Sequence, residues 1–549
     1  MKKEIIYYTL ALFFGNILCY IFFNIKILSL AIFLVVTVIM ILTLSKKHFF
    51  IWAGFLIIGF LGFHNFFNIN LKGDKFLMRV VNVSTPRVTL SFKGREVYIY
   101  DFTKSMKEGE KLVLTGDFKK NITYEKGAIG ALENHKIISR EEDILTKVYN
   151  FRKVIKSKFQ DALGESRGAL LSGVAFGDLK GMDSQDMEDF KALGIIHSIS
   201  ISGFHLNLVY FTLKRFLGTK PSIIISLIYV IFTGAKVSSL RAFIMILFLV
   251  LSTKVYKKYN GVTILAFSAL LLMFYRPHYS LNMSFHLSFL STLGILLYMD
   301  KLTKILYKLP KCLNTPLSIT LSAQILTYPY VAIALNYFTI GFIMGNLLIT
   351  PIISLLIILG NAAIIFYPIP IVFDSILYMA RIIIIFMERV SEILVKINPN
   401  GLYVDYKYGV IYTLLIISFY LYFKGYKNMK YLPIAIALSG VFWIYSIFPT
   451  ITVRTISSDT VYFINYKFSR VFISEKEIKD YYLKNKLKYG NLIESKEEKY
   501  KVNFNKTYDI VIKNKKIYVY KKKDLHYETV LEDGVVLKIL PNNIVKIGG

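Results

Sequence analysis

Residues 194–211 decide the fold class and read Gly-Ile-Ile-His-Ser-Ile-Ser-Ile-Ser-Gly-Phe-His-Leu-Asn-Leu-Val-Tyr-Phe. Polar side chains stand inside a stretch that is otherwise apolar enough for a lipid bilayer. The Ser-Ile-Ser-Ile-Ser alternation has a period of two and ends at Gly203, which argues against a straight helix facing lipid. In hydrocarbon, irregular polar backbone survives only where protein buries it or where it lines a watery cavity. We therefore predict that residues 196–207 form a broken or tightly packed helix beside a path through a membrane.

The composition of the whole chain agrees with a membrane protein. Of its 549 residues, 54% are hydrophobic, the mean hydropathy is +0.50, and several runs reach bilayer-spanning length. The first apolar run, residues 5–23, is followed by a second run and by no small-residue cleavage site, so we expect a retained anchor rather than a signal peptide. Cys19 and Cys312 are far apart in sequence, which excludes a disulfide framework or a cysteine metal site.

The expected fold is a polytopic α-helical membrane protein with an N-terminal extracytoplasmic small β domain and a C-terminal β-rich soluble domain. We predict five regions: N-terminal transmembrane helices over 1–69, a β domain over 70–141, an amphipathic helix with a re-entrant or linker segment over 142–192, a channel domain over 193–449, and a basic β-rich domain over 450–549.

Short runs rich in Val, Tyr and Phe predict the first β domain. The runs are 76–83, 87–92, 95–100 and 111–118, and Lys93-Gly94 predicts a hairpin turn. A small barrel of the oligonucleotide-binding (OB) type fits this pattern, and a generic small β domain fits nearly as well.

Apolar runs predict three membrane spans before the β domain and ten after it. The later spans are expected at 193–213, 221–235, 237–253, 261–275, 279–299, 317–335, 341–367, 371–395, 408–423 and 431–449. Basic loops then fall on one side, which should be cytoplasmic, and both soluble domains lie outside. Charged residues in 371–395 leave open an interfacial helix there, which would reverse the side of the C-terminal domain.

The chain carries 67 basic against 36 acidic residues, a net charge of +31. Positive-inside loops and attraction to anionic membrane lipids account for most of this excess. Residues 450–549 hold 20 Lys and Arg against 12 Asp and Glu, a net charge of +8. Basic residues interleaved with aromatic ones suit single-stranded DNA, and a solvated lysine face is an equal alternative. The candidate DNA-binding surface consists of Lys515, Lys516, Tyr518, Tyr520, Lys521 and Lys522.

Polar residues recur within the predicted spans. Arg241 begins an apolar helix, where the helix dipole is already positive. Its side chain either snorkels to the headgroups or holds an anionic phosphate at that helix end. Helices interrupted at corresponding depths are typical of translocation sites. The candidate translocation residues are Asp178, His197, Ser200, Ser202, Gly203, His205, Asn207, Ser239, Arg241, Arg276, Ser284, His286, Ser288, Gln324 and Asn346.

A metal enzyme and an intramembrane serine protease are the enzyme alternatives to a transporter for these polar residues. His197 and His205 are eight residues apart, about 12 Å along a continuous helix, which is too far to share one metal ion, so we expect no metal or other cofactor. Ser200-Ile-Ser-Gly203 resembles the Gly-x-Ser-Gly of intramembrane serine proteases, with Ser202 as nucleophile and His286 as base, although the leading glycine is missing. A transporter of another anionic or lipid-linked substrate is a third possibility.

Several motifs in order resemble the ComEC family of competence proteins. The matching segments are Gly177-Asp178, His197 through Ile201-Ser-Gly-Phe-His205, Ser238-Ser-Leu-Arg-Ala242, and Pro277 through Ser284-Phe-His-Leu-Ser-Phe289. His286 replaces the family's usual glutamine, and Gln324, Pro329, Asn346 and Pro351 resemble its late-span positions.

The resemblance implies a multi-pass bacterial inner-membrane channel, and not an enzyme, that passes single-stranded transforming DNA into the cytoplasm. It also implies partners: a DNA receptor, a cytoplasmic helicase-like motor and a separate nuclease. Many members of the family end in a metallo-β-lactamase-like domain. Only His526 lies beyond residue 449 here, so we expect a C-terminal domain without that metal site.

We predict that segment 450–549 binds single-stranded DNA weakly and cuts nothing, with or without zinc or manganese. Binding is expected from the +8 charge, and absence of cutting from the shortage of metal ligands. Electrophoretic assays at several salt concentrations check both expectations. Degradation that EDTA abolishes would overturn the second, and binding that ignores salt would show that the lysines are only a solvated face.

Overall fold

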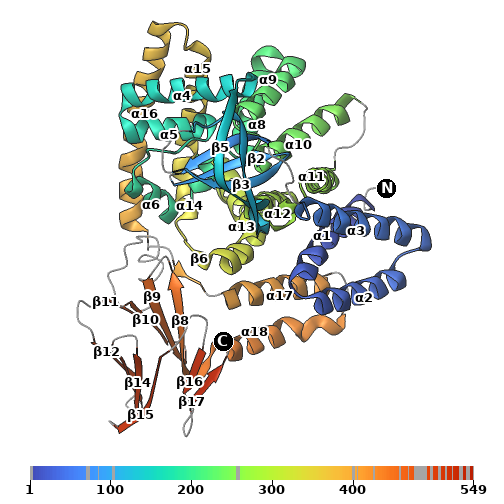
Figure 1. Cartoon of the computed structure of the whole chain (residues 1–549), viewed down its shortest axis with the longest axis vertical. Helices are drawn as coiled ribbons and strands as arrows, with labels where there is room; N and C mark the ends of the chain where they lie inside the picture. Colours follow the sequence, from blue (N-terminus) through green and yellow to red (C-terminus); the bar gives the residue numbers. More distant parts are fainter. Residues whose placement is uncertain are drawn as a thin grey trace. The chain divides into compact units, whose positions relative to one another are not determined.

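We describe the protein from a computed structural model (Figure 1). The structure describes residues 4–69, 75–84, 86–101, 106–254, 260–398, 402–404, 406–423 and 427–456, and within the C-terminal region 459–467, 469–474, 491–494, 499–504, 508–513, 516–521, 524–530, 536–539 and 544–547. The chain divides into two compact units. Unit 1 comprises Met1–Lys191, Ile195–Gln324 and Ile343–Glu392, and unit 2 comprises Ala192–Gly194, Ile325–Phe342 and Ile393–Gly549.

Three long apolar helices open unit 1: α1 (Glu4–Asn24), α2 (Lys26–Thr43) and α3 (Lys46–Phe67). α1 and α3 lie against each other with little space between their backbones. A Cβ added to Gly15 would collide with the Leu56 carbonyl group, and one added to Gly59 would collide with that of Leu12. Small residues at such crossings let membrane helices approach closely.

A closed five-stranded barrel follows, built from β1 (Phe76–Ser84), β2 (Arg87–Phe92), β3 (Arg95–Tyr100), β4 (Lys111–Thr123) and β5 (Ala128–Glu141) in the order β1-β2-β3-β5-β4. This architecture is OB-like, as the sequence predicted. Lys93 and Gly94 both have positive φ, 46° and 82°, and Phe92 pairs with Arg95, which confirms the predicted turn. The sequence prediction missed β5, because Gly130 and the polar residues that follow it obscure the strand pattern.

The helices that follow the barrel, up to residue 397, lie in unit 1, except that parts of α6, α13, α14 and α16 belong to unit 2. They are α4 (Ile144–Leu163), α5 (Glu165–Phe176), α6 (Ser184–Ala192), α7 (Ile196–Ile199), α8 (Gly203–Leu217), α9 (Thr219–Phe232), α10 (Val237–Lys254), α11 (Gly261–Tyr275), η2 (Pro277–Leu281), α12 (Met283–Ile305), α13 (Lys311–Leu335), α14 (Phe342–Met344), a π-helical turn (Gly345–Ile349), α15 (Thr350–Phe366) and α16 (Pro370–Ile397). Figure 1 shows α4 and α5 side by side, and α15 packs on α5.

Unit 2 contains β6 (Tyr337–Phe338), β7 (Leu402–Tyr403), α17 (Tyr406–Phe423) and α18 (Leu432–Ile444), followed by strands. One sheet has the order β11-β10-β9-β8-β16-β17 and the other the order β12-β13-β14-β15. Their bounds are β8 Ser446–Ile456, β9 Asp459–Lys467, β10 Ser469–Ser474, β11 Asn491–Glu494, β12 Lys499–Phe504, β13 Tyr508–Lys513, β14 Lys516–Lys521, β15 Asp524–Val530, β16 Val536–Ile539 and β17 Ile544–Ile547. The C-terminal region is therefore β-rich.

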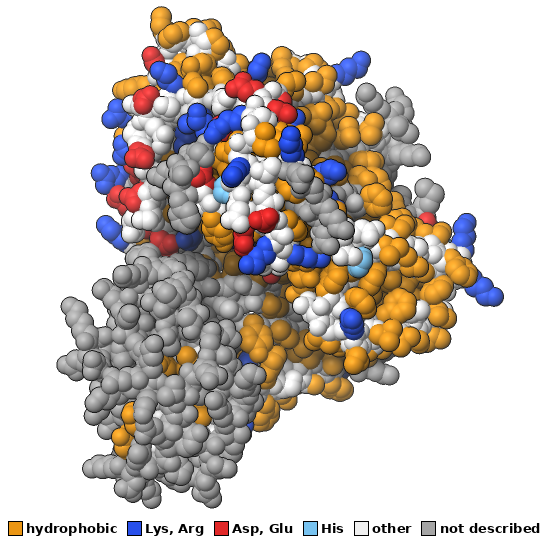
Figure 2. Space-filling view, in the orientation of Figure 1, with side chains coloured by type: hydrophobic (Ala, Val, Ile, Leu, Met, Phe, Trp, Pro, Cys, Tyr) orange, Lys and Arg blue, Asp and Glu red, His pale blue; other side chains and the backbone are white. Residues whose placement is uncertain are grey.

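Six helices in the described residues are long and apolar enough to cross a membrane: α1, α2, α3, α13, the segment Phe342–Phe366, and α16. Shorter apolar helices cover Thr219–Phe232, Val237–Ser252, Gly261–Tyr275 and Met429–Ile444. These helices support a multi-pass membrane protein. Figure 2 shows hydrophobic side chains spread over the surface of the N-terminal helices and charged ones over the barrel and its neighbours.

Two predicted spans are wrong as single helices. Residues 193–213 are divided into α7 and α8, because Ser200 and Ser202 adopt extended backbone. Residues 279–299 are divided at Asn282, which ends η2 and caps α12. The predicted span 431–449 ends as a helix at Ile444 and continues as strand β8.

The sides on which the soluble domains lie stay a prediction. With the exposed Cys312 replaced by serine, a cysteine at exposed Lys119 of the barrel and another near Lys522, outside the described residues, should both react with a membrane-impermeant thiol reagent on intact cells. A cysteine at exposed Lys47 is the matched control and should stay unlabelled, because it lies on the predicted cytoplasmic side. Labelling at 119 without labelling at 522 would place residues 371–395 on the membrane surface.

Candidate functional site: a buried cation beside a broken helix

The break between α7 and α8 is held by its own polar side chains. Ser202 has extended backbone and its Oγ accepts a hydrogen bond from the Phe204 N–H at 3.2 Å. The Ser202 N–H donates to Nδ1 of His205 at 3.3 Å, which completes a capping box. The serine and the histidine therefore satisfy backbone groups that a helix start leaves open.

His205 is fully buried, and one of its ring nitrogens has no hydrogen-bond partner among the described residues. Because Nδ1 accepts from the Ser202 N–H, the proton of the neutral ring lies on Nε2. Nε2 is buried and has no partner within the described part of the chain. A buried donor in this state costs about 1–3 kcal/mol, so a ligand atom that accepted from it would be stabilised.

Arg241 lies against the start of α8. Its side chain is 8% exposed, and its Nε has no hydrogen-bond partner among the described residues. A Cβ added to Gly203 would lie 2.5 Å from Nη2 of Arg241, so the glycine makes room for the guanidinium. No ion pair to Arg241 occurs in the described ranges, and the centroid of the Phe289 ring lies 6.0 Å from its guanidinium carbon.

Two serines at the start of α10 behave differently. Ser238 donates to the Ile201 carbonyl oxygen at 3.2 Å and so attaches α10 to the break. Ser239 is fully buried, and its Oγ has no partner in the described part of the protein. The guanidinium of Arg241 thus lies at the positive end of α8, where an anion is favoured, and the buried Ser239 hydroxyl belongs to the helix turn that carries this cation.

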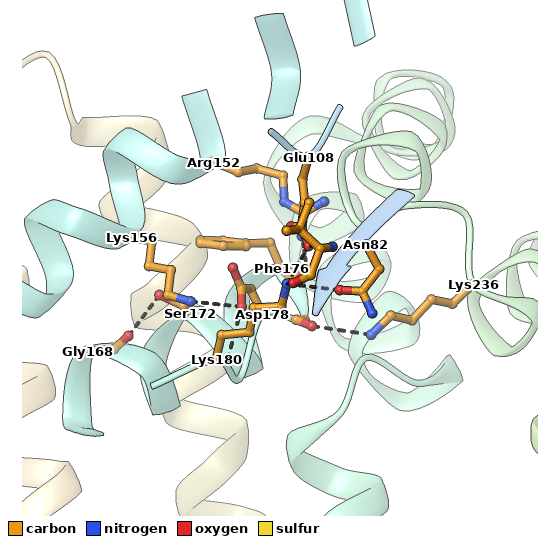
Figure 3. Close-up of polar contacts among 12 residues, drawn as sticks. Asn82, Glu108, Arg152, Lys156, Gly168, Ser172, Phe176, Asp178, Lys180 and Lys236 are labelled. Carbon is orange, nitrogen blue, oxygen red and sulfur yellow. Dashed lines mark hydrogen bonds and ion pairs between the residues drawn. The ribbon is translucent and has the colours of Figure 1, made fainter. Parts of the chain in front are cut away.

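A second cationic group lies at the carboxyl end of α5 (Figure 3). Gly177 ends the helix at φ +84°, and its N–H donates to the carbonyl oxygens of Ser172 and Gly173. Arg152 of α4 donates to the Phe176 carbonyl oxygen at 3.2 Å, and Lys236 donates to that of Gly177 at 3.4 Å. Cations are favoured at this negative end of a helix dipole.

Asp178 lies in the same group. Its carboxylate pairs with Lys156 at 2.8 Å and accepts from the Lys180 N–H at 3.0 Å. The Lys180 ammonium reaches the barrel, where it contacts Asn82, the Val83 carbonyl and Glu108. Asp178 therefore organises a junction between the barrel and the helices. Burial lowers the pKa of the Arg152 guanidinium and the pKa of Lys236.

The two groups adjoin each other. A Cβ added to Gly177 would lie 2.8 Å from both Ile201 Cγ1 and Lys236 Nζ. Ile201 belongs to the break between α7 and α8, so the turn after α5 contacts the segment that holds Ser202 and His205. The structure thus brings Asp178, Ser202, Gly203, His205, Ser239 and Arg241 into one neighbourhood of unit 1.

Ser202 and His286, the predicted nucleophile and base, each have another hydrogen-bond partner. The Ser202 Oγ lies 3.1 Å from Nδ1 of His205, whereas Nε2 of His286 lies 2.9 Å from the Ser280 carbonyl oxygen. A nucleophile needs a base within hydrogen-bond reach, and His286 has been placed to satisfy the backbone of η2 instead.

Arg276 contacts the barrel instead of the break. A Cβ added to Gly94 would lie 3.9 Å from Nε of Arg276, and the Arg276 guanidinium lies over the Tyr275 and Tyr279 rings.

The other predicted residues lie in several places. His197, Asn207 and Ser284 are exposed, and Ser200 follows α7. Ser288 has a buried Oγ without a partner in the described segments. Gln324 lies in α13.

Asn346 occupies the π-helical turn at the start of the α15 segment, where its side chain accepts a hydrogen bond from Thr350 Oγ1 at 3.2 Å. π-Helical turns occur often at functional sites, because they interrupt the regular hydrogen-bond ladder. The glycine-asparagine pair and the proline at 351 were the sequence signal for this interruption.

Of the predicted DNA-binding surface, Lys515 and Lys522 lie outside the described residues. Lys516, Tyr518, Tyr520 and Lys521 lie on β14, where the two tyrosines are half-buried and alternate with the buried Ile517 and Val519. The tyrosines therefore share one face of the strand.

Sequence reasoning missed several residues of the site. Arg152 and Lys156 lie on the amphipathic helix α4. Lys236 is an isolated cation between two apolar runs, and this isolation is the sequence signal that could have identified it. Tyr210 and Ser226 are fully buried, and their hydroxyl oxygens lack partners among the described residues, although nothing in their local sequence marks them.

Comparison with known proteins shows which family part of this chain resembles. Residues 174–427 match the family described as Competence protein, and this range contains every predicted translocation residue. An uncharacterized protein of Aquifex aeolicus is 29% identical over 215 residues, which cover 37% of this chain and 50% of that protein. ComE operon protein 3 of Bacillus subtilis is 25% identical over 234 residues, covering 41% of this chain and 30% of that protein.

An uncharacterized protein of Mycoplasma genitalium is 32% identical over 166 residues, covering 29% of this chain and 42% of that protein. The chain thus spans half or less of the length of these relatives. No solved structure matches the chain at a comparable level.

Replacing Gly177 by alanine should lower the midpoint of thermal unfolding of the detergent-purified protein more than the matched change Gly234→Ala. Both glycines have φ +84°, where alanine costs about 1–2 kcal/mol. A Cβ at 177 also meets Ile201 and Lys236, whereas one at 234 meets nothing within 4 Å. Equal shifts in the two variants would show that Gly177 is required only for its positive φ angle and not for its close contacts with Ile201 and Lys236.

Proposed function

We propose that this chain, which belongs to the ComEC family of competence proteins, forms an inner-membrane channel that passes single-stranded DNA into the cytoplasm. The proposal makes it a transporter and not an enzyme. It combines the family membership, which supports a role in competence DNA uptake, with the chemistry of the group around Arg241.

The observation that carries the proposal is the buried Arg241, a cation without an acidic partner among the described residues. Arg241 lies at the positive end of α8, and two positive features side by side are unfavourable in a low-dielectric interior. A phosphodiester group supplies the missing negative charge and accepts hydrogen bonds from Arg241 Nε and His205 Nε2. Each of these donors lacks a partner among the described residues.

The group around Asp178 fits the approach to such a path. Arg152, Lys156, Lys180 and Lys236 outnumber the carboxylates of Asp178 and Glu108, so the junction beside the barrel attracts a polyanion. Exposed basic residues raise the rate at which nucleic acid arrives, and less hydrated ones hold its phosphates during passage. The OB-like barrel is the kind of domain that binds single strands in other proteins.

Three partners in the proposal come from the family alone: a DNA receptor and a separate nuclease outside the membrane, and a helicase-like motor inside it. The proposed DNA-binding role of β14 rests instead on the lysines and tyrosines of the C-terminal region. Transport of a different phosphate-bearing substrate, including a lipid-linked one, uses the same donors, so the experiment below includes that outcome.

Replacing either Arg241 or His205 by alanine should reduce natural transformation by at least about tenfold while the amount of protein in the membrane stays unchanged. Arg215→Ala is the matched control, because Arg215 is exposed in the last turn of α8 and should tolerate the change. Transformation frequency and immunoblots of membranes are the measurements. Normal transformation in both variants would contradict the channel role, and loss of the protein from membranes would assign both residues to folding.

Binding of fluorescent single-stranded DNA to the purified chain at several salt concentrations tests the ligand directly. One lost phosphate contact lowers the slope of log affinity against log salt by about 0.7. We expect that decrease in Arg241→Ala and a smaller one in Arg241→Lys, which keeps the charge. A chain that binds no single-stranded DNA but is stabilised by phospholipid or polyprenyl phosphate would favour the lipid-linked substrate.

A further inference from the structure

One pocket of unit 1 is lined mainly by acidic residues, in contrast to the basic group around Asp178. It has a volume of about 530 Å³ and lies where the start of α5 meets α6 and the last turns of α16. Five carboxylates and one guanidinium line it. The lining residues are Leu163, Gly164, Glu165, Ser166, Arg167, Gln185, Asp186, Asp189, Phe190, Glu388, Ser391 and Glu392.

The single cation of the lining, Arg167, already forms an ion pair. Arg167 forms a two-point pair with Glu388, Nε to Oε1 at 2.9 Å and Nη2 to Oε2 at 2.8 Å. Glu392 pairs with Arg389 at 3.1 Å, so three lining carboxylates, Glu165, Asp186 and Asp189, form no ion pair within the described residues. Asp186 accepts from the Ser166 hydroxyl at 2.9 Å, and Asp189 accepts from the Gln185 amide at 2.9 Å.

Two of these carboxylates are held in surroundings that oppose their charge. Burial raises the pKa of Asp186 and the pKa of Asp189, and neighbouring carboxylates, Glu388 beside Asp186 and Asp186 beside Asp189, raise them further. A cation in the pocket would relieve both effects, because it would stabilise the charged forms.

An independent observation points to a ligand. Ser391 lines the same pocket and is 4% exposed, and its Oγ has no hydrogen-bond partner in the described part of the chain. A buried hydroxyl without a partner is uncommon in folded proteins, since it loses its bonds to water without replacement. Its lone pairs are available to an N–H donor that enters the pocket.

The arrangement of the carboxylates indicates which class of cation the pocket can bind. Nowhere in the described residues do three His, Cys, Asp or Glu side chains converge as a metal site would need. The acidic groups instead come from three helices around a pocket whose volume suits a small organic molecule. Separate carboxylates match separate ammonium groups along a flexible chain better than one compact ion.

We propose that this pocket binds a linear polyamine, whose ammonium groups pair with Asp186, Asp189 and Glu165 while one N–H donates to Ser391. The site is separate from the group around Arg241 and does not rest on the channel proposal. A polyamine at this position links α5, α6 and α16 through its ammonium groups and so stabilises the helices that carry the Gly177-Asp178 turn.

Calorimetric titration of the purified full-length chain with spermidine tests the proposal. We expect saturable binding that weakens by at least about tenfold in the double variant Asp186→Asn/Asp189→Asn, because two charge-assisted contacts are lost. Asp161→Asn/Asp300→Asn is the matched control, since it removes two exposed carboxylates outside the pocket and should leave the affinity unchanged. Asp186→Glu/Asp189→Glu, which keeps both charges, should retain most of the binding.

Ser391→Ala separates a ligand contact from a folding role. Removing a hydroxyl that has no partner should leave thermal stability equal or higher in the absence of spermidine, yet reduce the stabilisation that spermidine provides. Equal weakening in the exposed control pair, or unchanged spermidine binding in the Asp186/Asp189 variant, would overturn the proposal. Stoichiometric Mg²⁺ binding that excludes spermidine would also overturn it in favour of a metal site.

Discussion

The carbonyl end of α5 is the constraint on which the arrangement of unit 1 depends. A helix end leaves carbonyl oxygens without intrahelical partners, and apolar surroundings provide no water to replace them. Arg152 and Lys236 donate to the last of these carbonyls, and Lys156 pairs with Asp178 just beyond them. These cations come from α4 and from the turn before α10, so one requirement for hydrogen bonds positions three segments. Lys180 extends the same group to the barrel.

The break before α8 is closed by a local helix cap, yet it contains a buried donor without a hydrogen-bond partner among the described residues. Nδ1 of His205 completes the cap of the helix, whereas its Nε2 has no partner among the described residues. Gly203 lets the Arg241 side chain approach the same helix end, where no carboxylate of the described chain neutralises it. An anion would resolve a conflict that the described residues leave in place, and this is the physical basis for the proposal that a phosphate group binds there.

Charge is separated along α5. The acidic pocket adjoins the amino end of this helix, and the basic group surrounds its carboxyl end, which are the two arrangements that the helix dipole favours. The 12 residues of α5 place these ends about 18 Å apart. The proposed cationic ligand and the proposed polyanion would therefore lie at opposite ends of one helix.

The sequence by itself determined the membrane class, the strands that begin the barrel, the turn at Lys93-Gly94 and the interruption near Ser200–Gly203. Each of these depends on residues that are neighbours in the chain, through hydrophobic run length, strand alternation or backbone freedom at glycine. Only the tertiary structure decided that Ser202 bonds to His205 instead of His286, that Arg241 lies against Gly203, and that Arg152 and Lys236 bond the end of α5. The acidic pocket likewise joins residues of α5 and α16 that are more than two hundred positions apart. Such contacts leave no period or motif in the sequence. They form only after the helices have packed, when a helix end that needs a donor comes within reach of a side chain that can supply one.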